Sequence, residues 1–128
     1  LLIEDIREWG GAMVMNDGYY YASMGLTLKT TPINSVSGAL LGGEGLFNLS
    51  VQGNGVCLLE SPCPKEELVV VELDNDVLKI DGSYAVCWSP SLSFTVERTT
   101  KTLVGSAASG EGLVNVYRGT GRVMMALV

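Results

Sequence analysis

Short apolar runs separated by turn residues predict a chain that is almost entirely β. The runs are rich in β-branched and aromatic residues, which fit the pleated surface of a strand, and they lie at residues 69–71, 77–80, 84–88, 94–96 and 113–117. Around the fourth run, Leu92, Phe94 and Val96 alternate with hydroxyl side chains, and this two-residue period is typical of a half-buried strand. Helical spacing occurs at Leu2, Ile6 and Trp9, over too few residues to predict a helix.

Turn residues mark where the predicted strands end. Asp-Gly pairs at 17–18 and 81–82 lie between apolar runs, which is a strong hairpin signal. Further runs are separated by Gly-x-Gly at 53–55 and 119–121 and by Asp-Asn-Asp at 74–76. We therefore expect roughly a dozen short strands of ordinary length.

Several motifs recur in the same order and indicate an internal duplication. Residues 43–49 recur at 110–116, an offset of 67 (110 − 43), and residues 53–55 recur at 119–121, an offset of 66 (119 − 53). Upstream, Asp-Gly-Tyr-Tyr at 17–20 corresponds to Asp-Gly-Ser-Tyr at 81–84, an offset of 64 (81 − 17). Ordered blocks separated by small insertions are hard to obtain by chance, so we predict two related repeats.

The predicted architecture is a single β domain over residues 1–128. The first repeat covers about residues 11–61, a polar connector covers 62–67, and the second repeat covers about 68–128. Because each repeat has one apolar sheet face, the two faces can bury one another in a two-sheet roll or barrel. The predicted fold class is all-β, a β-roll sandwich built from two repeats.

Composition adds an expectation about partners. Charged residues make up 17% of the chain and 16 residues are glycine, which fits a repeated β structure whose strand edges or outer face are covered by another subunit. We therefore expect a homo-oligomer and allow for a protein partner. The net charge of −6 makes a nucleic-acid partner unfavourable, because phosphate backbones are neutralised by clustered Lys and Arg.

The absence of histidine from the sequence excludes whole classes of chemistry. A Ser-His or Cys-His nucleophile, a histidine metal site and imidazole acid–base catalysis all need a residue type that occurs 0 times. Cys57, Cys63 and Cys87 are odd in number and include no Cys-x-x-Cys pair, so no disulfide framework is predicted. Buried thiols are favoured over a site made of three thiolates and a carboxylate.

Membrane and targeting signals are weak. The longest strictly apolar run, 123–128, has six residues, whereas a spanning helix needs about 20. With no signal-peptide pattern at the start, we expect a protein of the reducing interior of a cell or organelle, which in a bacterium is the cytoplasm. The sequon at Asn48 is then an ordinary strand sequence. Leu1 in place of an initiator methionine and the apolar end at Val128 suggest a piece of a longer protein.

Glu44 and Glu111 form the candidate carboxylate pair, because each lies between two glycines of the repeated motif. Two carboxylates can act as acid and base or hold a hard cation. We favour hydrogen bonding of each glutamate within its own tight turn, since a catalytic pair needs two unlike environments. The glycine clusters at 42–45 and 53–55 match no phosphate-binding loop, so nucleotide binding is not predicted.

Aromatic and basic residues give little support for nucleic-acid binding. The tyrosines at 19–21 could stack bases, but successive strand side chains alternate faces, and sheet packing is favoured. Trp88 is predicted to pack on the core at the end of a strand. Arg98 and Lys101 are too sparse for a phosphate-binding surface.

Three segments together resemble one known family. They are the repeated Gly-Glu-Gly-Leu block with its Gly-x-Gly, the Gly-Tyr-Tyr-Tyr-Ala-Ser segment at 18–23 and the Val-Cys-Trp-Ser-Pro-Ser-Leu segment at 86–92. From about Gly11 onward the chain resembles the altered-inheritance-of-mitochondria-24 family, which is grouped with proteins like the tryptophan RNA-binding attenuator. The resemblance implies a double-stranded β-helix, oligomerisation, a longer full protein and, for a eukaryotic member, a mitochondrial location. It implies no catalytic residue.

The predicted function is accordingly non-enzymatic. We expect an oligomeric β-roll protein that serves as a protein-interaction or scaffold module, with no catalytic, cofactor-binding or metal-binding residue. The alternative is a small-ligand or RNA-binding protein of the attenuator-like type. Metal-assisted hydrolysis through Glu44 and Glu111 ranks third.

Overall fold

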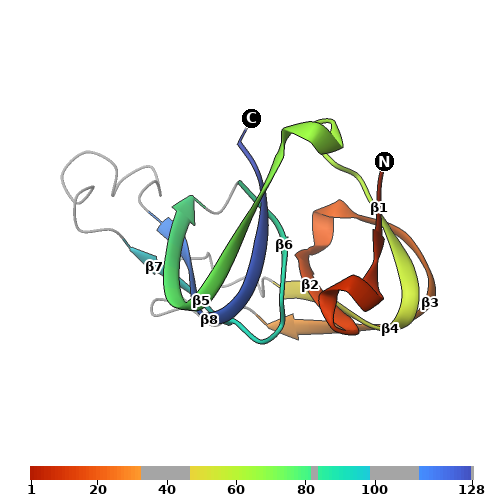
Figure 1. The fold of residues 1–128 in the computed structure, drawn as a ribbon, viewed down its shortest axis with the longest axis horizontal. Coiled ribbons are helices and arrows are strands. Elements are labelled where there is room, and N and C mark those ends of the chain that lie inside the picture. The colour runs from red at the N-terminus through yellow and green to blue at the C-terminus, as the bar shows by residue number, and fades with distance from the viewer. Residues whose placement is uncertain (33–46, 82–83, 99–112, 128) are drawn as a thin grey trace.

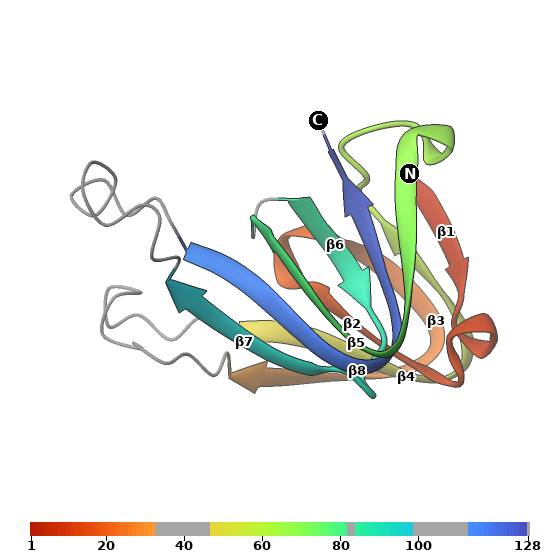
Figure 2. The same ribbon diagram turned by 60° about the vertical axis from the view of Figure 1, so that its left-hand side comes forward.

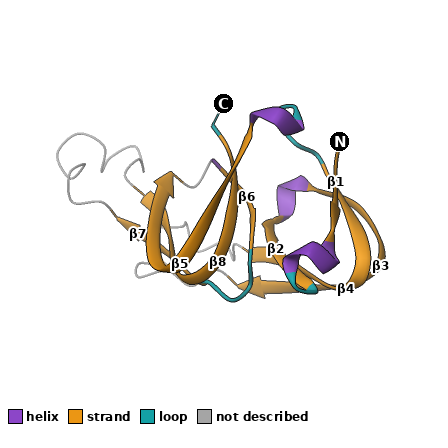
Figure 3. Cartoon of the chain, in the orientation of Figure 1, coloured by secondary structure: helices purple, strands orange, loops and turns teal. Residues whose placement is uncertain are grey.

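The all-β prediction is confirmed. The computed structural model describes residues 1–32, 47–81, 84–98 and 113–127, and these residues contain strands, turns and short 3₁₀ helices but no α-helix (Figure 3). The strands are β1 (Leu2–Asp5), β2 (Ala12–Asn16), β3 (Tyr20–Pro32), β4 (Phe47–Leu59), β5 (Leu68–Asp81), β6 (Ala85–Trp88), β7 (Ser93–Arg98) and β8 (Leu113–Ala126). The 3₁₀ helices are η1 (Ile6–Trp9), η2 (Asp17–Tyr19) and η4 (Lys65–Glu67).

Strand pairing is antiparallel throughout and divides the sheet into two halves (Figure 1). In the first half, β4 pairs with β3 along one edge and with β1 and β2 along the other. In the second half, β8 pairs with β5 along one edge and with β6 and β7 along the other. A short pairing of β2 with β6 joins the halves into one sheet.

The expectation of a dozen short strands is wrong, because the Gly-x-Gly and Asp-Asn-Asp signals lie inside long strands. Gly53 lies within β4 at a φ of 137° and Gly119 lies within β8 at a φ of 122°. The 74–76 segment is a bulge in β5, where the register with β8 shifts. Glycine in a strand allows a bulge or bend instead of ending the strand, and Figure 2 shows β5 and β8 curving together through a U-shaped bend.

The two Asp-Gly hairpins are also not formed. Residues 17–18 belong to η2, and the strands on either side of it, β2 and β3, pair with opposite edges of β4 rather than with each other. The second pair shows the same arrangement, since β5 and β6 flank β8. At 17–18 the chain does turn, through η2, but pairing with a shared central strand decides where the next strand lies. The weak helical spacing at the start forms η1, which is four residues long.

The pairing registers of the two halves correspond. In the first half Leu59 pairs with Leu2 and Tyr20; Met125, 66 residues later (125 − 59), pairs with Val69 and Ala85. A one-residue bulge follows Tyr20, and another follows Ala85. Next along the first half, Leu58 pairs with Ile3 and with Ala22. At the corresponding place in the second half, Met124 pairs with Val70 and with Cys87.

This correspondence differs in detail from the motif comparison. In the pairing registers, each β4 residue corresponds to the β8 residue 66 positions later, whereas the Gly-Glu-Gly-Leu blocks of the sequence are offset by 67. The correspondence also begins at Leu2, before the boundary at about residue 11 suggested by the motifs. The predicted repeat boundaries themselves stay a prediction.

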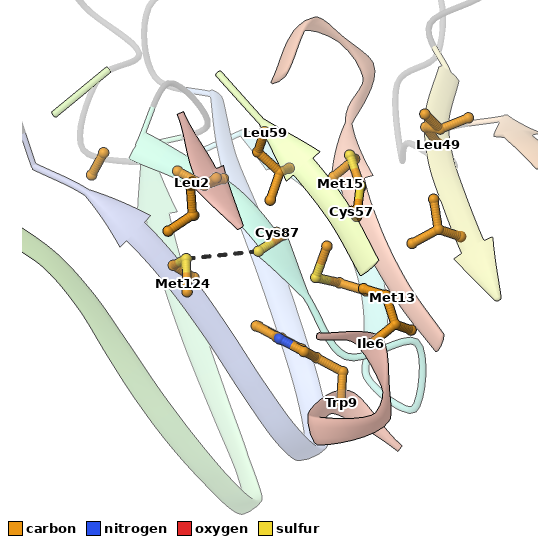
Figure 4. Close-up of a cluster of buried hydrophobic side chains, with 13 residues drawn as sticks. Leu2, Ile6, Trp9, Met13, Met15, Leu49, Cys57, Leu59, Cys87 and Met124 are labelled. Carbon is orange, nitrogen blue, oxygen red and sulfur yellow. Dashed lines mark hydrogen bonds between the residues drawn. The ribbon is translucent and has the colours of Figure 1, made fainter. Parts of the chain in front are cut away.

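Two clusters of buried side chains lie on opposite faces of the sheet. The first cluster (Figure 4) comprises Leu2, Ile6, Trp9, Met13, Met15, Leu49, Val51, Cys57, Leu59, Val86, Cys87, Met124 and Ala126. The second cluster comprises Leu73, Ala85, Trp88, Leu92, Tyr117, Val123 and Met125. Strands β6 and β8 contribute to both clusters, so the second half presents one sheet face to its own core and the other to the core of the first half.

We predict that Gly55→Ala destabilises the fold by about 3 kcal/mol or more. A Cβ on Gly55 would lie 1.9 Å from the carbonyl oxygen of Met24 on β3, and two paired backbones cannot separate without breaking the ladder. Urea unfolding monitored by circular dichroism measures the loss. Gly18→Ala is the matched control, because its Cβ would meet Asn16 Oδ1 at 3.6 Å, an ordinary contact; equal losses for the two variants would contradict the prediction.

Candidate functional site

Strands β3 and β5 are long edge strands. Among the described strands, β3 pairs only with β4 and β5 only with β8, so each leaves one row of backbone groups without a strand partner. Charged side chains discourage further pairing at such edges, and β5 carries Glu72, Asp74, Asp76, Lys79 and Asp81. Strand β3 has Lys29 as its sole charged residue over 13 positions, so it is the less protected edge.

An apolar face lies beside the β3 edge. Cross-strand partners in an antiparallel sheet share a face, and the registers place Ile3, Leu58 and Ala22 side by side, with Val56 and Met24 two residues along. Ile3 is 62% exposed and Met24 75% exposed, and the other three side chains are half-buried. We call these five residues the outer face of the first half. Contiguous exposed apolar residues of this kind are typical of interaction surfaces.

The tyrosines at 19–21 do not share one exposed surface. Tyr19 and Tyr20 pack against the first cluster, and the Tyr20 hydroxyl forms a 2.8 Å hydrogen bond with Ser23 Oγ. Tyr21 is the exposed member of the three. The sheet-packing interpretation therefore describes two of the tyrosines, and a base-stacking platform would have Tyr21 alone to offer.

A shallow hollow of about 470 Å³ lies beside η2. Its lining residues are Leu1, Gly18, Tyr19, Glu60, Ser61 and Pro62. Ligand sites are normally concave and apolar with a few converging polar groups, and this hollow offers the Glu60 carboxylate beside a mixed lining. It is the feature on which the small-ligand alternative can be tested.

Glu4 is a buried carboxylate that sequence reasoning missed. It is 7% exposed, accepts a 3.0 Å hydrogen bond from Trp9 Nε1 and lies 3.8 Å from Lys65 Nζ. Alternation along β1 could have revealed it, because Glu4 shares the inward period of Leu2. A buried carboxylate needs such partners, and the hydrogen bond from Trp9 holds η1 against β1.

Arg122 fastens the same segment to the second half. Its guanidinium lies 4.5 Å from the centre of the Trp9 ring, a cation–π arrangement, and it donates a hydrogen bond to the Glu8 carbonyl oxygen. Because Arg122 belongs to β8, η1 is held by both halves.

Two of the three thiols are buried, as predicted. Cys57 and Cys87 are fully buried, and Figure 4 shows Cys87 beside Met124, with 3.9 Å between the sulfur atoms. Burial, and then the Glu4 carboxylate, raises the pKa of Cys57 to about 11; burial raises the pKa of Cys87 further still. Since the thiolate is the nucleophile and the metal ligand, both sulfurs are protonated and unreactive near neutral pH.

The remaining candidate residues divide into described and undescribed ones. Trp88 is confirmed as a core aromatic, since it ends β6 and stacks on Phe94 with ring centroids 5.0 Å apart. Asn48 is a buried strand residue, as expected. The predictions for Glu44, Glu111, Lys101 and the 42–45 cluster fall outside the described residues, as does the Arg98 side chain.

The described ranges contain no group of three or more Cys, Asp or Glu side chains able to hold a metal ion. No helix within those ranges has the length and hydropathy needed to cross a bilayer.

The sequence model of the family described as mitochondrial biogenesis AIM24 matches residues 2–126. The chain belongs to the AIM24 family. An uncharacterized protein of Streptococcus pyogenes serotype M6 is 29% identical over 110 residues, which cover 85% of this chain and 43% of the relative.

A crystal structure of a Streptococcus pyogenes protein has the same fold. It matches with a TM-score of 0.74 and 25% identity, over 99% of this chain and 53% of that one. The AIM24 chain therefore spans about half the length of the relatives it matches. Neither relative carries a described activity.

We predict that one thiol reacts with a thiol reagent at pH 7.5 and that two react only on unfolding. Cys63 is partly exposed and free, whereas Cys57 and Cys87 are buried and protonated. Absorbance titration with an aromatic disulfide reagent, with and without urea, measures both groups. Cys63→Ser is the control and should abolish the fast phase; rapid labelling that survives this change would contradict the assignment.

We predict that stability falls as pH rises from about 9 to about 11. The unfolded Cys57 thiol loses its proton near its ordinary pKa of 9.0, whereas the folded thiol keeps it to about 11. In that window the unfolded state binds fewer protons, so the free energy of unfolding decreases with pH, and the full contribution is present below pH 9. Urea unfolding at several pH values measures the slope. Cys57→Ala should make it shallower, and an unchanged slope would exclude Cys57 as a cause.

Proposed function

We propose that this AIM24 domain is non-enzymatic and works through contact between protein surfaces, as an interaction or scaffold module that self-associates. The observation that carries the proposal is the outer face of the first half, which exposes Ile3 and Met24 next to the poorly protected β3 edge. An edge strand supplies backbone hydrogen bonds and an apolar face supplies burial, and together they make a surface for β-pairing with another protein.

The polar groups of the interior support the same function. The Glu4 carboxylate is engaged by Trp9 and Lys65, and the raised pKa values of Cys57 and Cys87 keep their thiols protonated. A general base or nucleophile needs a pKa near the working pH and access to a substrate. The Glu4 carboxylate instead holds η1 in place, and the two thiols fill the core.

Self-association is favoured over nucleic-acid or small-ligand binding. The net charge of −6 repels phosphate backbones, and one exposed tyrosine is a poor stacking platform. The hollow beside η2 offers few converging polar groups.

We further propose that the protein lies in the bacterial cytoplasm and that it arose by duplication of one four-strand unit. The shared registers of β4 and β8 support the duplication.

Burial of the outer face would make a measurable contribution to the free energy of association. Full burial of an exposed Ile or Met side chain stabilises a complex by roughly 1.5–3 kcal/mol, and every 1.4 kcal/mol changes affinity about tenfold. Because Ile3 is 62% and Met24 75% exposed, burying what they still expose would contribute roughly 2–4 kcal/mol together, or about 1.5 to 3 orders of magnitude in affinity, before backbone pairing and the cost of association are counted.

We predict that the double variant Ile3→Asp/Met24→Asp weakens self-association at least about tenfold. Because both side chains are exposed, unfolding free energy should change by no more than about 1 kcal/mol. Sedimentation equilibrium measures the association constant, and urea unfolding checks the fold. Leu127→Asp, an exposed apolar position outside the strands, is the control. A monomeric parent protein at millimolar concentration would refute self-association.

A further inference from the structure

The junction between β2 and β6 shows how this sheet joins two of its own halves. Val14 pairs with Trp88 and Met15 pairs with Cys87. Val14 and Trp88 face the second cluster, and Met15 and Cys87 face the first. The junction therefore buries both sheet faces at once: the outer face of the second half packs into the core of the first.

The same two positions occur a second time, on the edge strands. Val14 pairs with Ser50 on β4, and Lys79 pairs with Val116 on β8, 66 residues after Ser50 (116 − 50). Lys79 on β5 thus corresponds to Val14, and Ile80 corresponds to Met15.

The other side of the junction is repeated in the same way. Trp88 pairs with Val123 on β8, and Ser23 pairs with Cys57 on β4, 66 residues earlier (123 − 57). Ser23 on β3 thus corresponds to Trp88, and Ala22 corresponds to Cys87. The edges of β5 and β3 that lack a described partner are the counterparts of the two edges that meet in the junction.

Residues on β5 and β3 are less buried than their counterparts in the β2–β6 junction, as expected for edges that lack a described partner strand. Met13 and Met15 are 0% exposed, whereas their counterparts on β5, Leu78 and Ile80, are half-buried. On the opposite side, Cys87 is fully buried and its counterpart Ala22 is half-buried.

The outer faces of the two halves repeat this difference. Met124 is 5% exposed because it packs into the first cluster. Its counterpart Leu58 lies on the outer face of the first half, beside exposed Ile3. Around a second junction the apolar side chains are therefore half-buried or exposed, while Lys79 and Ser23 stand where the existing junction has Val14 and Trp88.

We propose that β5 of one molecule pairs antiparallel with β3 of a second copy of this chain, with Lys79 opposite Ser23 and Ile80 opposite Ala22. This pairing repeats the β2–β6 junction between molecules and places the outer face of one copy over the second cluster of the next. It rests on the proposed self-association and assigns its partner and register. Charge is compatible with it, because acidic β5 would meet a strand that carries no acidic residue.

The contact is head-to-tail, since it uses two different edges of the same molecule. A bound pair still offers one free β3 edge on one copy and one free β5 edge on the other, so repetition yields a closed ring if the rotation closes and an open filament if it does not. An edge-to-edge dimer of two β3 strands would use neither the register nor the burial pattern described above.

Disulfide trapping tests the register. In a Cys63→Ser background, a Ser23→Cys protein and a Lys79→Cys protein are each prepared, mixed in equal amounts and oxidised. Directly opposite residues in antiparallel strands have Cα atoms about 4.5–5.5 Å apart, within disulfide range. We expect covalent dimer in the mixture, about tenfold above either protein alone.

Two controls bracket the result. Thr27→Cys mixed with Lys79→Cys places the thiols about 13 Å apart along β3 and should trap little dimer. Ala22→Cys mixed with Ile80→Cys is an independent pair that leaves the Tyr20–Ser23 hydrogen bond intact and should also trap dimer. Sedimentation of the unoxidised parent gives the association state.

The outcomes separate this inference from the proposed function. Trapping by both matched pairs and not by the Thr27 pair supports the β5–β3 register. Self-association without such trapping, or equal trapping by Ser23→Cys alone, overturns the register and leaves self-association standing. A monomeric parent with no trapping overturns both, and would mean that a further segment of a longer protein or an unrelated partner covers these edges.

Discussion

Two residue pairs between β2 and β6 connect the two halves of this sheet. Because Val14–Trp88 and Met15–Cys87 point to opposite faces, the junction builds two cores rather than one. The first core closes over Met15 and Cys87, and the second closes over Trp88 with Val14 packed against it. Other elements depend on this link: η1 reaches across it to Arg122, and Met124 is buried in the cluster formed largely by the first half.

The bends in the long strands make that packing possible. Strands β4 and β8 each pair with two strands along one edge, because a bulge near a Gly-x-Gly lets one strand run through both parts of its half. At Gly55 the neighbouring backbone comes so close that a side chain has no room. The same motif that looked like a break in the sequence is therefore what keeps the strand continuous. The AIM24 domain uses glycine here for close approach and curvature.

The edges left by this arrangement give the domain its chemical character. Its buried ionisable groups are tied into the core, and its apolar surface lies next to a strand edge with little charge. This combination is the basis on which we propose binding through the sheet edges. The β2–β6 junction shows how two strand edges of this sheet pair and bury their side chains. The corresponding residues on β5 and β3 are less buried, which indicates what a second pairing of this kind would cover.

Alternation and β-branched runs were enough to predict an all-β chain with a buried Trp88, because strand period and side-chain hydrophobicity are local properties. Buried Cys57 and Cys87 followed from composition in the same way. The sequence did not reveal that the strands flanking each Asp-Gly pair lie on opposite edges of β4 or β8 instead of forming a hairpin. It also did not reveal that β4 and β8 continue through Gly53 and Gly119, or what Glu4 and Arg122 contact. Each of those depends on which distant strand lies alongside, a choice set by packing of the halves. Local chemistry determined the elements; only the tertiary structure decided their partners, because strand pairing and core burial are non-local.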